Sequence, residues 1–202
     1  LDHGIHAGGW RREIGHEEVV AVAVDELVGP DHLLDRARRI CPYLHVRLPH
    51  PQNVATATHS ILGVIQRYAT TWEPFLPGSL LLDLTGTTRL FGSACDVAAK
   101  IQTEVLTQFH LDGAAGVGSN KLVAQTAATL IAPSELYDVR SGSERLFMSP
   151  LSIRALPGVH RPCMRTVLKR LHDLNLRSLG DVADSPLDAL EAALGNYAGQ
   201  LS

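Results

Sequence analysis

The sequence WEPFLPGSLLLDLTG, residues 72–86, decides the fold of the chain around it. Its leucine-rich run over residues 80–84 predicts a buried strand, which ends at a Thr-Gly turn. The two prolines before that run exclude a helix there, because proline lacks the N–H that a helix needs and clashes with the preceding turn. The leucine run is therefore a strand of a sheet, and helices must come from the segments on either side of the stretch.

Asp83 is the carboxylate within this predicted strand. Phosphoryl transfer by two metal ions needs at least two or three converging carboxylates. Asp83 stands alone in its strand, so we expect it to cap the turn at Thr85 and Gly86 rather than to hold a metal ion.

Alternating elements extend outward from this strand. Apolar residues at helical spacing predict helices over residues 54–69 and 94–109, and short apolar or small-residue runs predict strands over 19–24, 113–118 and 136–139. This alternation indicates an α/β or α+β layer in which helices cover a sheet.

The pattern changes near residue 149, where short helices separated by Pro and Gly begin. Pro162 can open a helix with an apolar stripe, and Ser185, Pro186 and Asp188 resemble a capping box for the next helix. The tail is therefore predicted to be a small helical domain.

The composition is that of an ordinary globular protein, with 202 residues, 45% hydrophobic residues and 19% charged residues. A net charge of −3 excludes a uniformly basic coat for nucleic acid but allows a local basic patch. Three widely spaced cysteines support neither a disulfide framework nor a zinc knuckle. No apolar run is long enough to span a membrane, so a cytoplasmic protein is expected.

The glycine-rich stretch over residues 113–121 joins a predicted strand to a predicted helix. Backbone N–H groups and Lys121 at such a helix start could meet a phosphate, which leaves a small α/β phosphate- or nucleotide-binding module as one hypothesis. The stretch lacks the spacing of a P-loop and the third glycine of a dinucleotide fingerprint. A tight structural turn is the simpler interpretation.

Six basic residues and one acid lie between Arg154 and Arg177. They surround the predicted turn at residues 156–160, an arrangement that resembles a helix-hairpin-helix, in which hairpin amides and nearby cations hold a DNA phosphate. A solvated basic face is the alternative.

Several motifs together resemble the Y-family (translesion) DNA polymerases. Residues 72–86 have the length and frame of that family's E-x-x-S-[IV]-D-E-A-F-L-D-L-T-G palm segment, and Leu90-Phe91-Gly92 follows where the family has L-F-G. Residues 116–124 resemble its G-[IV]-[AGS]-x-N-K-x-x-A motif, and Leu156-Pro157-Gly158-Val159 resembles its thumb signature L-P-G-[IV]-G.

The resemblance implies an α+β fold with a ferredoxin-like polymerase palm, reduced fingers and a small all-helical thumb of the helix-hairpin-helix type. The corresponding division is an N-terminal arm with a reduced fingers-like region at 1–52, a palm-like domain at 53–148 and a thumb-like domain at 149–202. No counterpart of the family's little finger is recognised before residue 202.

The departures from the family pattern concern its metal site. The positions that supply an Asp and a Glu in the family hold Gly78 and Ser79 here, and Asp2 lacks the aromatic pair that follows the family's first metal Asp. No catalytic residue, metal or cofactor is therefore expected. This form of the segment is similar to the catalytically inactive Y-family paralogues of the bacterial mutasome (ImuB-type).

The resemblance also implies a DNA-binding site. Residues carried over from the palm and thumb motifs are Ser119, Asn120, Lys121, Gly158, Val159, Arg161, Arg165 and Lys169, while His160 replaces the second hairpin glycine of the family. The implied function is a non-catalytic adaptor in DNA repair, the SOS response and translesion synthesis, located in the bacterial cytoplasm at the nucleoid. Its implied partners are DNA and, through regions outside this chain, an error-prone polymerase and the sliding clamp.

A working nucleotidyltransferase remains the main rival hypothesis. It would use Mg²⁺ at a metal site rebuilt from Asp83 and carboxylates such as Asp2 or Asp112.

Overall fold

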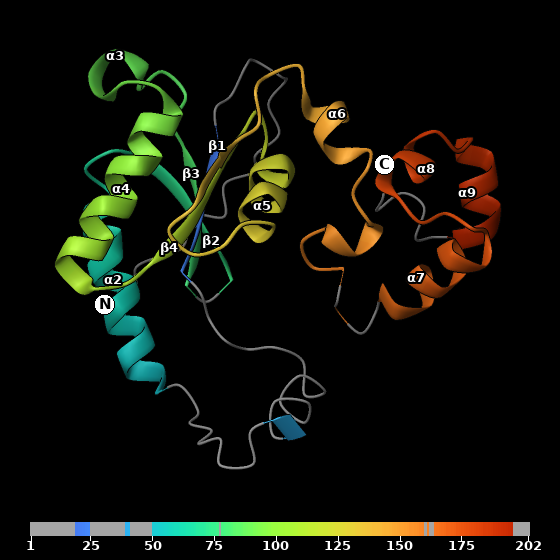
Figure 1. The fold of residues 1–202 in the computed structure, drawn as a ribbon, viewed down its shortest axis with the longest axis horizontal. Coiled ribbons are helices and arrows are strands. Elements are labelled where there is room, and N and C mark those ends of the chain that lie inside the picture. The colour runs from blue at the N-terminus through green and yellow to red at the C-terminus, as the bar shows by residue number, and fades with distance from the viewer. Residues whose placement is uncertain are drawn as a thin grey trace.

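A five-stranded sheet lies at the centre of the first part of the chain, seen in the computed structural model in Figure 1. The structure describes residues 19–24, 39–40, 50–76, 78–159, 161 and 164–195. The strands are β1 (Val19–Val24), β2 (Thr71–Leu76), β3 (Ser79–Asp83), β4 (Gly113–Gly118) and β5 (Leu136–Asp138). The predicted arm and most of the predicted fingers-like region lie outside the described residues.

The strand order is β2-β3-β1-β4-β5, with every pair antiparallel except β4 and β5. Helix α2 (Pro51–Ile65) connects β1 to β2, α4 (Ala94–Phe109) connects β3 to β4, and α5 (Lys121–Thr129) connects β4 to β5. Up to β4 this is the β-α-β-β-α-β arrangement of the ferredoxin-like motif. The α+β class expected from the resemblance is confirmed.

The two faces of the sheet pack against different helices, and β3 shows how the sequence achieves this. Leu80, Leu82 and Leu84 join the core formed with α2 and α4, whereas Leu81 packs with Ala124 of α5 on the opposite face. Side chains of a strand alternate between faces, so a continuous leucine run is needed where both faces are covered.

Gly116 allows α5 to approach the sheet. A Cβ atom at this position would lie 2.2 Å from the carbonyl oxygen of Ala124 and 2.5 Å from the nitrogen of Ala128. The glycine-rich composition of β4 is thus a packing requirement. The backbone of α5 rests directly on the strand, and any side chain at Gly116 would push it away.

β2 is a strand that the sequence reasoning did not assign. It forms an edge of the sheet, where Pro74 is tolerated because an outward-facing position needs no N–H donor. The pairing with β3 shifts register between Pro74 and Leu76. Phe75 lies in this irregular part and packs on the α5 side with Leu81.

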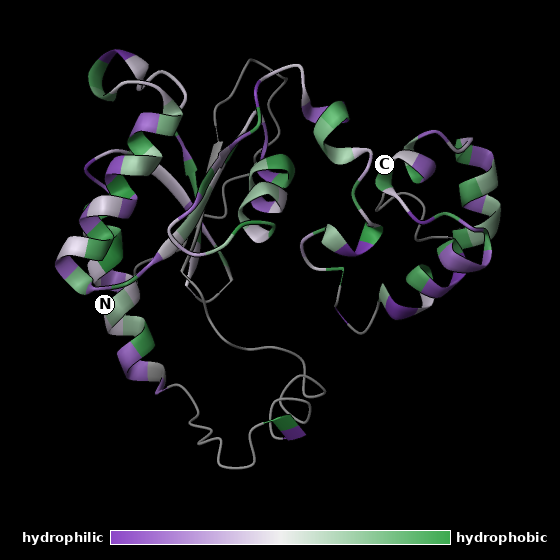
Figure 2. Cartoon of the chain, in the orientation of Figure 1, coloured by the Kyte–Doolittle hydropathy of each residue, from purple (hydrophilic) through white to green (hydrophobic). Residues whose placement is uncertain are grey.

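The C-terminal helical region, residues 149–195, has a hydrophobic cluster of its own. It contains α7 (Met164–Asp173), α8 (Leu179–Ala183), α9 (Leu187–Leu194) and a short 3₁₀ turn at Ile153–Ala155. Its buried members are Ile153, Val159, Val167, Leu171, Leu190 and Leu194. Hydrophobic and hydrophilic residues alternate along α7 in Figure 2, as expected of a helix with one buried side.

Two short helices complete the described fold, namely α3 (Thr88–Phe91) and α6 (Glu144–Met148). The capping box predicted for α9 is wrong, because no side chain caps that helix and Ser185 bonds back to the carbonyl of Asp181 instead. Capping boxes occur at Ser93 of α4 and Ser178 of α8. None of the described helices has both the length and the apolar character that crossing a membrane requires.

Candidate nucleic-acid interface

Gly78 and Ser79 lie at the connection between β2 and β3. Ser79 begins β3 and pairs with Leu76 of β2, so the two strands are joined by a two-residue loop. Gly78 in that loop has φ +76°, in the left-handed region that disfavours side chains. Neither Gly78, in the tight turn, nor Ser79 offers a carboxylate.

Asp83, at the other end of β3, has the capping role predicted for it. Its carboxylate accepts a hydrogen bond of 2.9 Å from the backbone N–H of Thr85. The strand register aligns Asp83 with Val19, and Val19 with Gly118 at the end of β4. Asp83 therefore lies at the opposite end of the sheet from the β2–β3 hairpin.

The register also separates Asp83 from Asp112. Asp112 precedes Gly113 at the start of β4, so roughly 20 Å of strand separates the two carboxylates at about 3.3 Å per residue. Asp112 instead accepts a 2.6 Å hydrogen bond from Ser134. The rebuilt site that would combine Asp83 and Asp112 is wrong for this geometric reason, and Asp2 lies outside the described residues.

Within the described part of the chain, no group of three or more His, Cys, Asp or Glu side chains could hold a metal ion together.

The turn from Gly118 to Lys121 engages its polar side chains within the protein. Ser119 donates a 2.5 Å hydrogen bond to Glu144, and the side chain of Asn120 caps α5 by accepting from the N–H of Val123 at 3.0 Å. Lys121 forms an ion pair with Glu73 of β2. The structural turn considered for this stretch is present, and all three predicted DNA-contacting residues also support the fold.

Arg161, Arg165 and Lys169 form what we call the basic stripe, which leads into and along α7. All three are exposed, whereas Val167 and Leu171 of the same helix are buried. Arg165 and Lys169 lie on α7, where a spacing of four residues places side chains on one side of the helix, and Arg161 precedes the helix. In the described part of the chain, the charged groups of the stripe form no side-chain hydrogen bond or ion pair. The three cations therefore face solvent as a group.

The other basic residues of this region behave differently. Arg170 donates to the carbonyl of Ala193 at 3.1 Å, and Arg177 donates to the side chain of Asn175 at 3.2 Å. The sequence cluster of six thus separates into the exposed stripe, two cations engaged locally, and Arg154, which is exposed beside the 3₁₀ turn.

The predicted hairpin lies directly before the stripe. Gly158 is exposed with φ +77°, while the side chain of Val159 is buried in the helical cluster. The backbone N–H of Arg161 bonds to the carbonyl of Gly158 at 3.1 Å, which closes the turn. Val159 can therefore offer only its main chain to a ligand. His160 lies outside the described residues.

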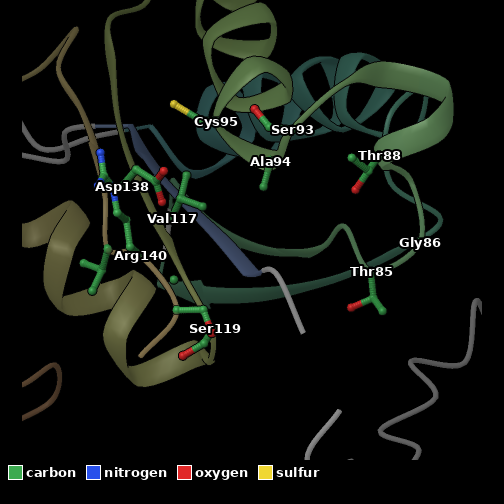
Figure 3. Close-up of a pocket in the computed structure, with 13 residues that line it drawn as sticks. Thr85, Gly86, Thr88, Ser93, Ala94, Cys95, Val117, Ser119, Asp138 and Arg140 are labelled. Carbon is green, nitrogen blue, oxygen red and sulfur yellow. The ribbon is translucent and has the colours of Figure 1, made fainter. Parts of the chain in front are cut away.

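An open pocket of about 380 Å³ lies where β3, β4 and β5 end beside the start of α4 (Figure 3). Asp138 and Arg140 bring opposite charges to it, and Cys95 and Ser119 also line it. Burial raises the pKa of the Cys95 thiol, and the charge of Asp138 raises it further. Of these residues the sequence reasoning singled out Ser119 alone. The other lining residues could be anticipated only from the fold, because several strands end at this edge of the sheet.

Glu73 and Glu144 are also residues that the sequence reasoning did not select. Each is the partner of a residue in the Gly118–Lys121 turn, at sequence separations of 48 and 25 residues. The sequence points to Glu73 alone, through the match of Glu73-Pro74 to the family segment.

The comparison with protein families gives a match to the impB/mucB/samB family over residues 22–129, more than half of the chain. DNA polymerase IV of Halorhodospira halophila is 34% identical over 165 residues, which cover 82% of this chain and 45% of that protein. DNA polymerase IV of Desulfatibacillum aliphaticivorans is 31% identical over 162 residues, which cover 79% of this chain and 39% of that protein. The chain thus spans less than half the length of these relatives.

Solved structures share the fold. The crystal structure of DinB from Sulfolobus solfataricus superposes with a TM-score of 0.75 at 19% identity, covering 91% of this chain and 65% of that one. An insertion ternary complex of Dbh DNA polymerase gives the same values. The chain therefore belongs to the impB/mucB/samB family and is a homologue of the Y-family DNA polymerases, as its motifs predicted.

Proposed function

We propose that this chain is a non-catalytic, polymerase-like scaffold that binds duplex DNA during DNA damage tolerance, of the type represented by the inactive mutasome paralogues. The sheet region serves as the palm and the C-terminal helical region as the thumb. Relatives named DNA polymerase IV support DNA as the ligand class, and a separate error-prone polymerase would supply the chemistry. The sliding clamp is the further partner we propose.

The β2–β3 hairpin is the observation that carries the non-catalytic part of this proposal. Two-metal phosphoryl transfer depends on carboxylates that hold both ions and stabilise the developing charge. Gly78 and Ser79 stand at two of the positions concerned, and the backbone at Gly78 has the left-handed φ that a tight turn demands. An aspartate at position 78 would either strain the turn or change its backbone conformation.

The basic stripe supports the DNA-binding part. Phosphate contacts by Lys and Arg provide most of the sequence-independent affinity for DNA. Arg161, Arg165 and Lys169 are exposed together and lie beside the hairpin at Gly158. A protein whose net charge is −3 would thus bind DNA through a local patch rather than over its whole surface.

A primer-extension assay tests the proposal. The protein is mixed with a labelled primer–template duplex, all four deoxynucleotides and either Mg²⁺ or Mn²⁺, and fluorescence anisotropy of the same sample reports whether the duplex is bound. We expect binding without extension of the primer. A DNA polymerase IV relative serves as the positive control for extension.

The variant Asp83→Ala separates the proposal from the rival nucleotidyltransferase. Template-dependent extension by the unmodified chain that disappears in Asp83→Ala would overturn the non-catalytic assignment. Absence of DNA binding at low salt would overturn the scaffold assignment.

A further inference from the structure

Helix α6 lies between the sheet and the C-terminal helices (Figure 1) and contacts both. On the sheet side, Phe147 and Met148 pack against a cluster formed by Val123, Ala127 and Val139. The ring of Phe147 also lies 5.4 Å from the ring of Tyr137 on β5, measured between centroids. This side of α6 is thus part of the packing around α5 and β5.

The backbone directly after α6 is hydrogen-bonded to the start of α8. The backbone N–H groups of Leu179 and Gly180 donate to the carbonyls of Leu151 and Ser149 at 2.9 Å and 3.0 Å. A Cβ atom at Gly180 would lie 3.0 Å from the oxygen of Ser149, so the two segments are in close backbone contact. Arg145 of α6 also forms an ion pair with Asp184 at 2.6 Å.

Ser119 connects the Gly118–Lys121 turn to this helix. Its hydroxyl donates to the carboxylate of Glu144, the first residue of α6, over 2.5 Å in a partly buried position. The same turn is held to β2 by the ion pair between Lys121 and Glu73. Polar contacts therefore run from the sheet edge through the turn and α6 to α8.

We propose that Ser119 and Glu144 are positioning residues, which set the orientation of the C-terminal helical region and its basic stripe relative to the sheet. This inference rests on the proposed function, because DNA is the ligand whose binding the orientation would serve. A patch held in its binding orientation loses less conformational freedom on association than one that must be ordered. Ser119 then contributes to DNA affinity without touching DNA.

This role differs in its measurable consequences from the direct DNA contact that the family resemblance implies for Ser119. Loss of a positioning hydrogen bond broadens the distribution of orientations in the free protein, whereas loss of a DNA contact leaves the free protein unchanged. A partly buried hydrogen bond contributes about 0.5–1.5 kcal/mol, which bounds the loss in affinity at roughly two- to twelvefold.

The test combines a distance measurement with DNA titrations. Nitroxide labels are placed on α4 and α9 by Thr107→Cys and Glu191→Cys, in a background with Cys41→Ser, Cys95→Ser and Cys163→Ser. Pulsed electron paramagnetic resonance then gives the distribution of label distances without DNA. The variants are Ser119→Ala, which removes the donor, and Glu144→Ala, which removes the acceptor. Ser141→Ala is the control, because Ser141 lines the same pocket without a hydrogen bond from its side chain.

We expect Ser119→Ala and Glu144→Ala to broaden the distance distribution and to weaken duplex binding several-fold. The slope of log affinity against log salt should stay the same, because no phosphate contact is removed. Ser141→Ala should give the same distance distribution and DNA affinity as the unmodified chain. Ser119→Thr, which keeps the hydroxyl, should keep the narrow distribution.

An unchanged distance distribution in Ser119→Ala and Glu144→Ala would overturn the positioning role, whether or not DNA affinity falls. Failure of the unmodified chain to bind DNA would overturn the proposed function separately, since the distance measurement requires no DNA.

Discussion

The sheet region and the C-terminal helical region use their polar residues in opposite ways. In the sheet region, Asp83, Asn120 and Lys121 each bond to a group of the protein itself, namely a turn N–H, a helix N–H and a carboxylate. In the helical region, the basic stripe of Arg161, Arg165 and Lys169 is exposed. These residues of the sheet region thus contribute to the fold, whereas the cations of the basic stripe are exposed to solvent.

Under the proposed function, this difference lets a polymerase fold bind DNA without a metal site. In the sheet region, Gly116 allows close packing and Asn120 caps a helix. In the family resemblance, Gly78 and Ser79 take the positions of the Asp and the Glu.

The largest expected effect is on the packing of α5. Gly116→Ala places a methyl group within 2.2 Å of a backbone oxygen, and relieving that clash requires α5 to move. We expect a loss of about 3 kcal/mol or more in the free energy of unfolding, the upper end for overpacked sites. Urea denaturation followed by circular dichroism measures it.

Gly63→Ala in the interior of α2 is the matched control, because a Cβ atom there has nothing within 4 Å. This change should stabilise the protein by about 0.5–1 kcal/mol, since alanine favours the helix over glycine. Equal effects of the two variants would contradict the described contact between α5 and β4.

The double change Gly78→Asp with Ser79→Glu returns both family carboxylates to the β2–β3 hairpin. We expect no primer extension and a loss of about 1 kcal/mol in stability, because the aspartate must adopt the left-handed φ of Gly78. Added Mg²⁺ should not raise the melting temperature, since a ligand stabilises only a fold that binds it.

Gly142→Ala provides the reference for backbone strain alone, since Gly142 has φ +86° and open space around its Cβ position. Extension of a primer by the double variant would show that a functional metal site needs only these two residues. The inference that the chain also lacks a counterpart of the family's first metal Asp would then be wrong.

The smallest expected effects concern the two capping boxes, one in each region. Hydrogen bonds from Ser93 hold the pKa of Asp96 below its ordinary value of 3.8, and those from the N–H groups of Ser178 and Arg177 do the same for Asp181. Each carboxylate therefore stabilises the fold above the pKa of the unfolded chain, and this contribution is lost as pH falls through the lowered pKa.

Asp96→Asn and Asp181→Asn should each lower stability slightly at pH 7, and the difference from the unmodified chain should shrink below about pH 4. Denaturation curves recorded at pH 7 and below about pH 4 measure this difference in stability. A difference that persists unchanged in acid would show that the carboxylate charges do not contribute to capping.

The sequence predicts local elements well where periodicity is strong. The expected bounds of residues 94–109 and 113–118 agree with those of α4 and β4, because each has an unbroken apolar pattern. The sequence does not predict β2 because Pro74 within it and Pro77 directly after it obscure the strand pattern, and only its pairing with β3 reveals an edge strand. Ser178 and Ser185 are each followed by Asp three residues later, so this spacing alone does not show which serine forms a capping box.

The candidate site was less predictable because its contacts are long-range. The basic cluster from Arg154 to Arg177 is visible in the sequence, and the family resemblance selects Arg161, Arg165 and Lys169 from it. The pairing of Lys121 with Glu73 joins residues far apart in the chain, and no local pattern specifies it. The turn at Gly78, in contrast, has a local signal in the sequence, since a Pro-Gly pair is a recognised turn signal.

The salt dependence of duplex binding tests the central claim most directly. A labelled primer–template duplex is titrated with the unmodified chain and with the triple variant Arg161→Ala, Arg165→Ala, Lys169→Ala at several salt concentrations. Arg89→Ala on α3, far from α7 in Figure 1, is the control, because it removes a cation outside the basic stripe.

Each phosphate contact contributes about 0.9 to the slope of log affinity against log salt, so the triple variant should lower that slope by up to roughly 2.7. Arg89→Ala should leave it unchanged. An unchanged slope in the triple variant, or no binding of the duplex at low salt, would contradict the assignment of the basic stripe as the DNA-binding surface.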